Sequence, residues 1–194
     1  MDSLSYSMGI LVAKNLKQQG FEGLDGASFA KGLEDVMNSN TLQITEEKAN
    51  QIAQQYLMEQ KSKAHAGTIE AGKTFLASNT NRTGVTTLPS GLQYEVMKAG
   101  TGPVPSASDE VRVHYHGTLL DGTIFDSSVQ RGQPAEFGVT QVIPGWVEAL
   151  QLMPTGSKWK LFIPYNLAYG DRGAGPTIKP FSTLVFEVEL LGIK

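Results

Sequence analysis

The placement of proline divides this chain more sharply than any other feature of its sequence. All nine prolines lie at or after Pro89, and none precedes it. Because proline costs about 3 kcal/mol in a helix interior, a long proline-free stretch favours helices. Beyond about residue 82, glycine and proline separate short runs of β-branched and aromatic residues, which is typical of strands joined by turns. We therefore expect a helical domain over residues 1–82 and a β-rich domain over residues 83–194.

Apolar residues at helical spacing predict three helices in the first domain. The first covers about residues 4–19, and the second covers about residues 26–38. The third begins at Thr45, whose hydroxyl can cap the first turn, and continues to about residue 78. From Glu59 onward its apolar stripe nearly vanishes, which is typical of a solvated helix that connects two domains. At 1.5 Å per residue, this connecting helix is roughly 50 Å long.

These helices give the N-terminal domain a thin hydrophobic core. Helical domains of this size bury a modest fraction of their surface and often depend on a partner. We therefore expect a homodimer through residues 1–60, and a self-sufficient helical hairpin is the alternative. The apolar residues expected at the dimer interface are Tyr6, Ile10, Phe29, Leu33, Ile52 and Tyr56. Two glycines of the connecting helix, Gly67 and Gly72, are candidate positions for a bend.

Composition and charge restrict the chemistry and the partners. The chain has no cysteine, which excludes disulfides, thiolate zinc sites and cysteine catalysis. Its formal net charge is -3 and its Lys and Arg are scattered, so we expect neither nucleic acid nor a membrane as partner. No run approaches the roughly 20 apolar residues of a membrane span, and no secretory signal opens the sequence. We therefore expect a cytoplasmic location.

The second domain is predicted to be an antiparallel sheet of five or six strands wrapped on one short helix. Alternating apolar and polar residues predict strands over residues 92–97, 111–116, 158–163 and 184–190. Residues 119–125 predict a hairpin around an Asp-Gly turn. The short helix is expected over residues 145–153, with Trp146 near its start. The fold class of the whole chain is therefore α+β.

Familiar catalytic motifs are missing from this domain. It has no Gly-x-Ser-x-Gly elbow, no phosphate-binding glycine loop and no paired carboxylates. His114 and His116 lie on one face of a predicted strand at a spacing that metal sites use, but no third ligand is in evident reach. Two solvated histidines are the preferred interpretation, and no metal or other cofactor is expected.

Five sequence motifs follow one another in the order and close to the spacing of a known family. They cover residues 111–117, 122–128, 142–146, 163–170 and 183–190. Together they closely resemble the FK506-binding protein (FKBP) family of prolyl isomerases over about residues 85–194. The helical domain resembles the dimerisation module of bacterial FKBPs of the macrophage-infectivity-potentiator type. The resemblance implies an N-terminal helical dimerisation module with a long connecting helix, then an FKBP-like antiparallel sheet.

The resemblance also implies a pocket whose residues carry over position by position. The residues implied to be catalytic are Tyr115, Phe125, Asp126, Tyr169 and Phe186. Those implied to bind substrate are Phe137, Val142, Ile143, Trp146 and Ile178, with Trp146 as the floor. The sequence departs from the family at Ala135, where many relatives have a wall aromatic, and at Ala174, where some have a histidine. These departures leave substrate preference and inhibitor affinity open.

The implied reaction, rotation of an X-Pro bond, requires no nucleophile, acid or metal. Its barrier of about 18–20 kcal/mol is the loss of amide resonance as the C–N bond twists. Because the planar amide is more charge-separated than the twisted one, a dry aromatic pocket favours the twisted form. Tyr169 is implied to donate its hydroxyl to the carbonyl next to the proline. Asp126 is implied either to steer the twisted carbonyl carbon or to order the pocket wall by pairing with Tyr115 and Arg131.

The implied partners are proline-containing polypeptide clients and the macrolide inhibitors tacrolimus and rapamycin. Two alternatives to an active isomerase stay open. One is a module that binds proline segments with little turnover, and the other is a holdase in which two arms of a dimer enclose an unfolded client. The intact set of pocket residues, Trp146 and Asp126 among them, favours the enzyme.

Overall fold

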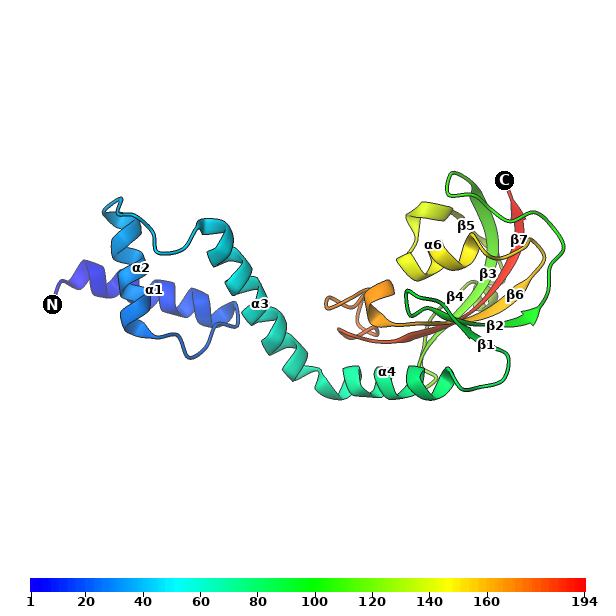
Figure 1. Ribbon diagram of the computed structural model, residues 1–194, viewed down its shortest axis with the longest axis horizontal. Helices are drawn as coiled ribbons and strands as arrows, with labels where there is room; N and C mark the ends of the chain where they lie inside the picture. The colour runs from blue at the N-terminus through cyan, green and yellow to red at the C-terminus, as the bar shows by residue number, and fades with distance from the viewer. The chain divides into compact units, whose positions relative to one another are not determined.

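The computed structural model describes all 194 residues, and Figure 1 traces their path. The chain forms two compact units, Met1–Ala64 and His65–Lys194. This division precedes the boundary expected at residue 82, because the last helix of the proline-free stretch packs on the sheet. No helix is both long enough and apolar enough to cross a membrane.

The first unit consists of three helices. They are α1 (Ser3–Gln18), α2 (Gly26–Met37) and α3 (Glu46–Ala64). The carboxylates of Asp2 and Asp25 accept hydrogen bonds from backbone N–H groups in the first turns of α1 and α2. Thr45 Oγ1 accepts the N–H of Lys48 at 3.2 Å, which confirms the cap predicted for the third helix.

This unit has almost no hydrophobic core of its own. Its one buried residue is the polar Asp35, whose carboxylate accepts hydrogen bonds from Lys31 and Asn40. The aromatic rings of Phe21 and Tyr56 stack with their centroids 5.7 Å apart. The other five residues expected at a dimer interface, Tyr6, Ile10, Phe29, Leu33 and Ile52, are between 40% and 58% exposed.

The second unit is built on a seven-stranded antiparallel sheet, whereas five or six strands were expected. The strands are β1 (Val85–Thr87), β2 (Gln93–Lys98), β3 (Glu110–Leu119), β4 (Ile124–Ser127), β5 (Ala135–Gly138), β6 (Lys158–Ile163) and β7 (Leu184–Ile193). They follow the order β1-β2-β6-β7-β3-β4, and β5 pairs with β3. The prediction missed β1 and β5, because three or four residues are too few to show an alternating pattern. Short helices α5 (Ser128–Arg131) and α6 (Pro144–Leu150) follow β4 and β5.

Helix α6 covers one face of the sheet and carries Trp146 into the core (Figure 1). Gly145 allows this close approach, because a Cβ atom at this position would lie 2.6 Å from Ile163 Cγ2. The core between α6 and the sheet consists of inward-facing residues that alternate along β3, β6 and β7. They include Val111, Val113, Leu161, Ile163, Leu184, Val188 and Leu190, all at most 1% exposed. The helix ends at Leu150, slightly earlier than expected.

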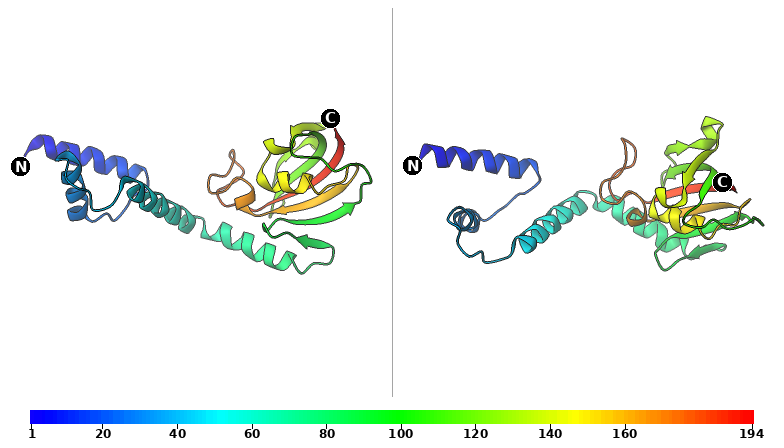
Figure 2. Two further views of the ribbon diagram at one scale, coloured as in Figure 1. Left: turned by 45° about the horizontal axis from the view of Figure 1, so that its top comes forward. Right: turned by 90° about the horizontal axis from the view of Figure 1, so that it is seen from above.

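Helix α4 (Ala66–Asn79) packs on the opposite face of the sheet (Figures 1 and 2). The Phe75 ring lies 5.7 Å from that of Phe162 in β6. Asn79 donates a hydrogen bond to Gln93 Oε1 at 2.8 Å, and both side chains are buried. The prediction of a solvated connector is therefore wrong for this part of the chain.

The connecting helix expected over residues 45–78 is interrupted at His65. This residue lies between α3 and α4 with φ -113° and ψ 20°, outside the helical region. Its ring contacts that of Phe181 at a centroid distance of 5.9 Å. The break therefore lies where α4 meets the sheet unit, and neither Gly67 nor Gly72 bends the helix.

Candidate active site

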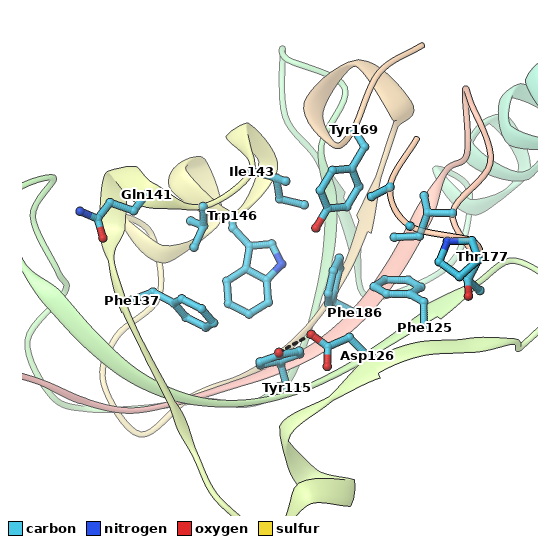
Figure 3. Close-up of a pocket in the computed structure, with 15 residues that line it drawn as sticks. Tyr115, Phe125, Asp126, Phe137, Gln141, Ile143, Trp146, Tyr169, Thr177 and Phe186 are labelled. Atoms are coloured by element: carbon cyan, nitrogen blue, oxygen red, sulfur yellow. Dashed lines mark hydrogen bonds between the residues drawn. The ribbon is translucent and has the colours of Figure 1, made fainter. Parts of the chain in front are cut away.

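A cavity of about 590 Å³, which we call the aromatic pocket, opens beside α6 (Figure 3). Its volume lies in the range of small-ligand sites. All ten residues implied by the family resemblance line it: Tyr115, Phe125, Asp126, Phe137, Val142, Ile143, Trp146, Tyr169, Ile178 and Phe186. The structure therefore brings together side chains from β3, β4, β5, α6, β7 and two loops.

Trp146 forms the base of this pocket and is 4% exposed. Its ring makes near-perpendicular contacts with Tyr115, Phe137 and Phe186 at centroid distances of 5.5, 6.0 and 5.2 Å. Edge-to-face packing of this kind is the favoured geometry of aromatic pairs. The floor is therefore held by rings from three different strands.

Phe125 and Phe186 form a wall whose shape depends on a glycine. Their rings meet at 82° with centroids 5.3 Å apart. A Cβ atom on Gly117 of β3 would lie 2.7 Å from the Phe125 ring and 2.8 Å from the Phe186 ring. Any larger residue there would displace both rings. The site therefore requires glycine at position 117, although Gly117 does not line the cavity.

Three polar side chains order the part of the wall next to Phe125 and Phe186. Tyr115 Oη donates a hydrogen bond to Asp126 Oδ2 at 2.5 Å. The Arg131 guanidinium pairs with the other carboxylate oxygen and donates to Tyr115 Oη at 2.8 Å. Both oxygens of Asp126 therefore have partners within the chain.

The charges of this wall follow from these contacts. Burial would raise the pKa of Asp126, but the hydrogen bonds from Tyr115 and Arg131 outweigh it and hold the pKa below its ordinary value. Burial and the hydrogen bond to Asp126 raise the pKa of Tyr115. At neutral pH the wall therefore consists of a carboxylate, a neutral phenol and a guanidinium, and its carboxylate is compensated.

Like Trp146 with its buried indole N–H, Tyr169 carries a polar group of the site that has no partner. Its hydroxyl points into the pocket and makes no hydrogen bond within the chain (Figure 3). Burial, with the negative charge of Asp126 as a smaller cause, raises the pKa of Tyr169. The hydroxyl therefore stays protonated and can donate a hydrogen bond to a bound ligand.

The loop over residues 170–181 completes the rim of the pocket. Backbone hydrogen bonds in both directions join Ala174 and Ile178, at 2.8 and 3.1 Å. At the base of the loop, the Phe181 N–H donates to the Gly170 carbonyl at 2.9 Å. The loop tip between Ala174 and Ile178 supplies Gly175, Pro176 and Thr177 to the cavity lining.

His114 and His116 do not form a metal site with a third ligand. Their Nδ1 atoms lie 3.1 Å from Ser128 Oγ and 3.0 Å from Ser127 Oγ. No group of three His, Asp or Glu side chains in the chain is arranged to hold a metal ion.

Comparison with known proteins decides the family. Residues 102–191 match the family described as FKBP-type peptidyl-prolyl cis-trans isomerase, and residues 1–96 match the domain amino terminal to it. The FKBP-type 22 kDa peptidyl-prolyl cis-trans isomerase of Escherichia coli is 47% identical over 97% of this chain and 93% of its own length. The chain belongs to the FKBP-type peptidyl-prolyl cis-trans isomerase family.

Other relatives match along the whole chain. The outer membrane protein MIP of Legionella longbeachae is 46% identical over 100% of this chain and 85% of its own length. The crystal structure of FkpA from Escherichia coli aligns with a TM-score of 0.66 and 38% identity over 99% of this chain and 93% of the other. The helical unit, like the sheet unit, is therefore part of the family likeness.

The structure puts the two alanines that sequence analysis singled out, Ala135 and Ala174, in different places. Ala174 lines the aromatic pocket, whereas Ala135 does not. Ala135 lies on β5 on the same side as Phe137, but its methyl group is too short to reach the cavity. Sequence reasoning also missed Gln141 and the loop tip from Gly175 to Thr177, whose small and polar residues show no pocket pattern.

Proposed function

We propose that the chain rotates X-Pro bonds of polypeptide clients between cis and trans within the aromatic pocket. The observation that carries this proposal is a closed aromatic floor beneath a tyrosine hydroxyl that lacks any partner within the chain. A proline ring fits over Trp146, and a carbonyl next to the proline lies within reach of a donor at the rim. The site needs no titrating group, because the reaction breaks no bond.

Binding of the twisted amide explains the rate enhancement in this proposal. Twisting reduces the charge separation of the amide, so a dry pocket walled by Phe125 and Phe186 disfavours the planar form more than the twisted one. The free hydroxyl of Tyr169 binds a carbonyl next to the proline and so positions the substrate while the bond rotates. Only contacts that are stronger in the twisted form accelerate the reaction.

For Asp126, the geometry supports ordering of the wall rather than direct contact with the carbonyl carbon. Tyr115 and Arg131 occupy both of its oxygens. Its charge is paired with that of Arg131, which reduces the negative potential that acts on the substrate. In this proposal Asp126 keeps the Tyr115 ring in place as a wall of the pocket, and Arg131 helps through its own bond to Tyr115.

A second role, holding unfolded clients, is supported by the first unit. Its helices leave apolar side chains exposed, among them Leu33 at 55% and Val36 at 64%. Burial of such a face in a homodimer through residues 1–60 explains how a unit with almost no core stays folded. Two arms joined in this way would enclose a client while either pocket acts on its prolines.

Inhibition by tacrolimus and rapamycin and a cytoplasmic location belong to the same proposal. The aromatic pocket has the size and the apolar lining that a macrolide needs, and the small Ala174 leaves its rim open. Fractionation of the source cells would test the location.

The deciding experiment is the isomerisation rate of a short Leu-Pro peptide, measured with and without tacrolimus. A rate well above buffer that the drug abolishes is the expected result. A rate equal to that in buffer would reject the enzyme and favour a module that only binds proline segments.

A further inference from the structure

A second cavity, which we call the α4 groove, lies beside the aromatic pocket. It has a volume of about 510 Å³ and is lined by α4, the β3–β4 hairpin and the loop that leads into β7. The lining residues are Gly67, Thr68, Ala71, Leu119, Leu120, Asp121, Thr123, Thr177, Lys179, Ser182 and Thr183. Thr177 lines both cavities, so the groove continues from the rim of the aromatic pocket.

Two hydroxyl groups in the α4 groove lack hydrogen-bond partners. Ser182 is 9% exposed and Thr183 is 4% exposed, yet neither hydroxyl makes a hydrogen bond within the chain. Both hydroxyl oxygens still reach the solvent of the groove, since the enclosed side-chain polar atoms without a partner are the indole nitrogens of Trp146 and Trp159. These hydroxyls are therefore available to a ligand that offers both donors and acceptors.

The charges at the groove point to a ligand without strong net charge. Asp121 and Lys179, both exposed, contribute one charge of each sign. A polyanion or a polycation would meet repulsion from one of them. A polypeptide main chain matches this lining, because every residue except proline offers one N–H donor and one C=O acceptor.

We propose that the α4 groove binds the segment of a client polypeptide adjacent to the proline in the aromatic pocket. This inference rests on the isomerase function proposed above, since the client enters with its proline. Beyond Thr177 the extended chain lies between α4 and the β3–β4 hairpin, where its amides pair with Ser182 and Thr183. The groove thus makes longer clients better substrates than short peptides.

The test compares a blocked tetrapeptide containing Leu-Pro with peptides extended by six residues on either side of it. All are measured on the full-length chain and on three variants. Ala71→Trp fills the groove from the exposed side of α4, and Ala77→Trp is the matched control, because Ala77 is exposed on the same helix and lines neither cavity. Ser182→Ala removes one unpartnered hydroxyl with little change of volume.

In the wild type, one of the extended peptides is expected to bind about tenfold more tightly than the tetrapeptide, which corresponds to one or two net hydrogen bonds. Ala71→Trp should abolish this advantage and Ser182→Ala should reduce it about threefold. Ala77→Trp should leave it unchanged, and all four proteins should turn over the tetrapeptide equally.

Equal affinity of the wild type for short and extended peptides would overturn the proposal. So would an advantage that survives Ala71→Trp, or equal losses in Ala71→Trp and Ala77→Trp. Affinity is measured by fluorescence anisotropy, separately from turnover. An inactive wild type would therefore reject the isomerase, while the anisotropy comparison would still decide for or against the α4 groove.

Discussion

At the scale of single residues, Tyr169 offers the most direct test of the mechanism. Tyr169→Phe keeps the ring and removes the unpartnered hydroxyl, so kcat/KM for a short Leu-Pro peptide is expected to fall about tenfold, the value of one hydrogen bond in the transition state. Tyr165→Phe is the matched control, because Tyr165 packs on Phe181 and does not line the aromatic pocket. Equal activity of Tyr169→Phe and wild type would remove the hydroxyl from the mechanism.

The pH dependence follows from the shifted pKa values of Asp126 and Tyr169. The pKa of Asp126 is lowered from its ordinary value and that of Tyr169 is raised, so neither group changes charge near neutral pH. We expect kcat/KM for a short peptide to be constant between about pH 5 and 9. A bell-shaped profile in this range would show that a titrating group takes part.

Folding stability, unlike activity, is expected to depend on the protonation of Asp126 at low pH. The folded pKa of Asp126 is depressed, so its contribution to stability is present above its unfolded pKa and is lost as pH falls through the folded value. The Asp126–Arg131 pair is half exposed, which keeps this contribution small.

The residues of the site were predictable because a chain of motifs, rather than any one residue, carries the family pattern. Trp146 alone would be taken for an ordinary core residue, but its spacing from Tyr115 and Phe186 identifies the pocket. Gly117 and Gln141 were not predictable. The need for glycine arises only from the two rings that meet above it, and an isolated glutamine is typical of any exposed turn.

At the scale of elements, the docking of α4 was the largest difference from expectation. The face that it buries or half-buries has helical spacing, with residues His65, Thr68, Ile69, Gly72, Phe75, Leu76 and Asn79. Four of these seven are small or polar, so the apolar stripe that sequence analysis uses is diluted. Buried partners on the sheet, such as Gln93, explain why polar residues are tolerated there.

Gly72→Ala tests whether α4 depends on this close approach. A Cβ atom at Gly72 would lie 2.4 Å from Thr183 Oγ1, and overpacking of this kind costs about 1–3 kcal/mol. Gly67 on the same helix has nothing within 4 Å of such an atom, so Gly67→Ala should stabilise by up to about 1 kcal/mol. Denaturant unfolding of the sheet unit would measure the free energy of unfolding of both variants, which should change in opposite directions. Stabilisation by both substitutions would show that Thr183 turns away without cost.

At the scale of the whole molecule, the exposed apolar face of the first unit predicts self-association. Sedimentation should give twice the 20.9 kDa chain mass at micromolar concentration. Leu33→Glu should weaken the dimer at least 100-fold, because a charge would be buried in an apolar contact. Gln54→Glu, on an exposed position of α3, should leave the dimer intact. A wild type that sediments as one chain would contradict the dimer.

Truncation can test whether the two units have separate functions, and its result depends on where the chain is cut. Removal of residues 1–64 keeps α4 on the sheet, whereas removal of residues 1–82 exposes Phe162 and leaves Gln93 without its partner on α4. We therefore expect the first truncation to retain full turnover of a short Leu-Pro peptide but to lose most of the catalysed refolding of a whole protein client. The second truncation should lose thermal stability as well, because α4 no longer covers the sheet. Equal refolding activity of the full chain and the 65–194 fragment would show that the helical unit has no part in holding clients.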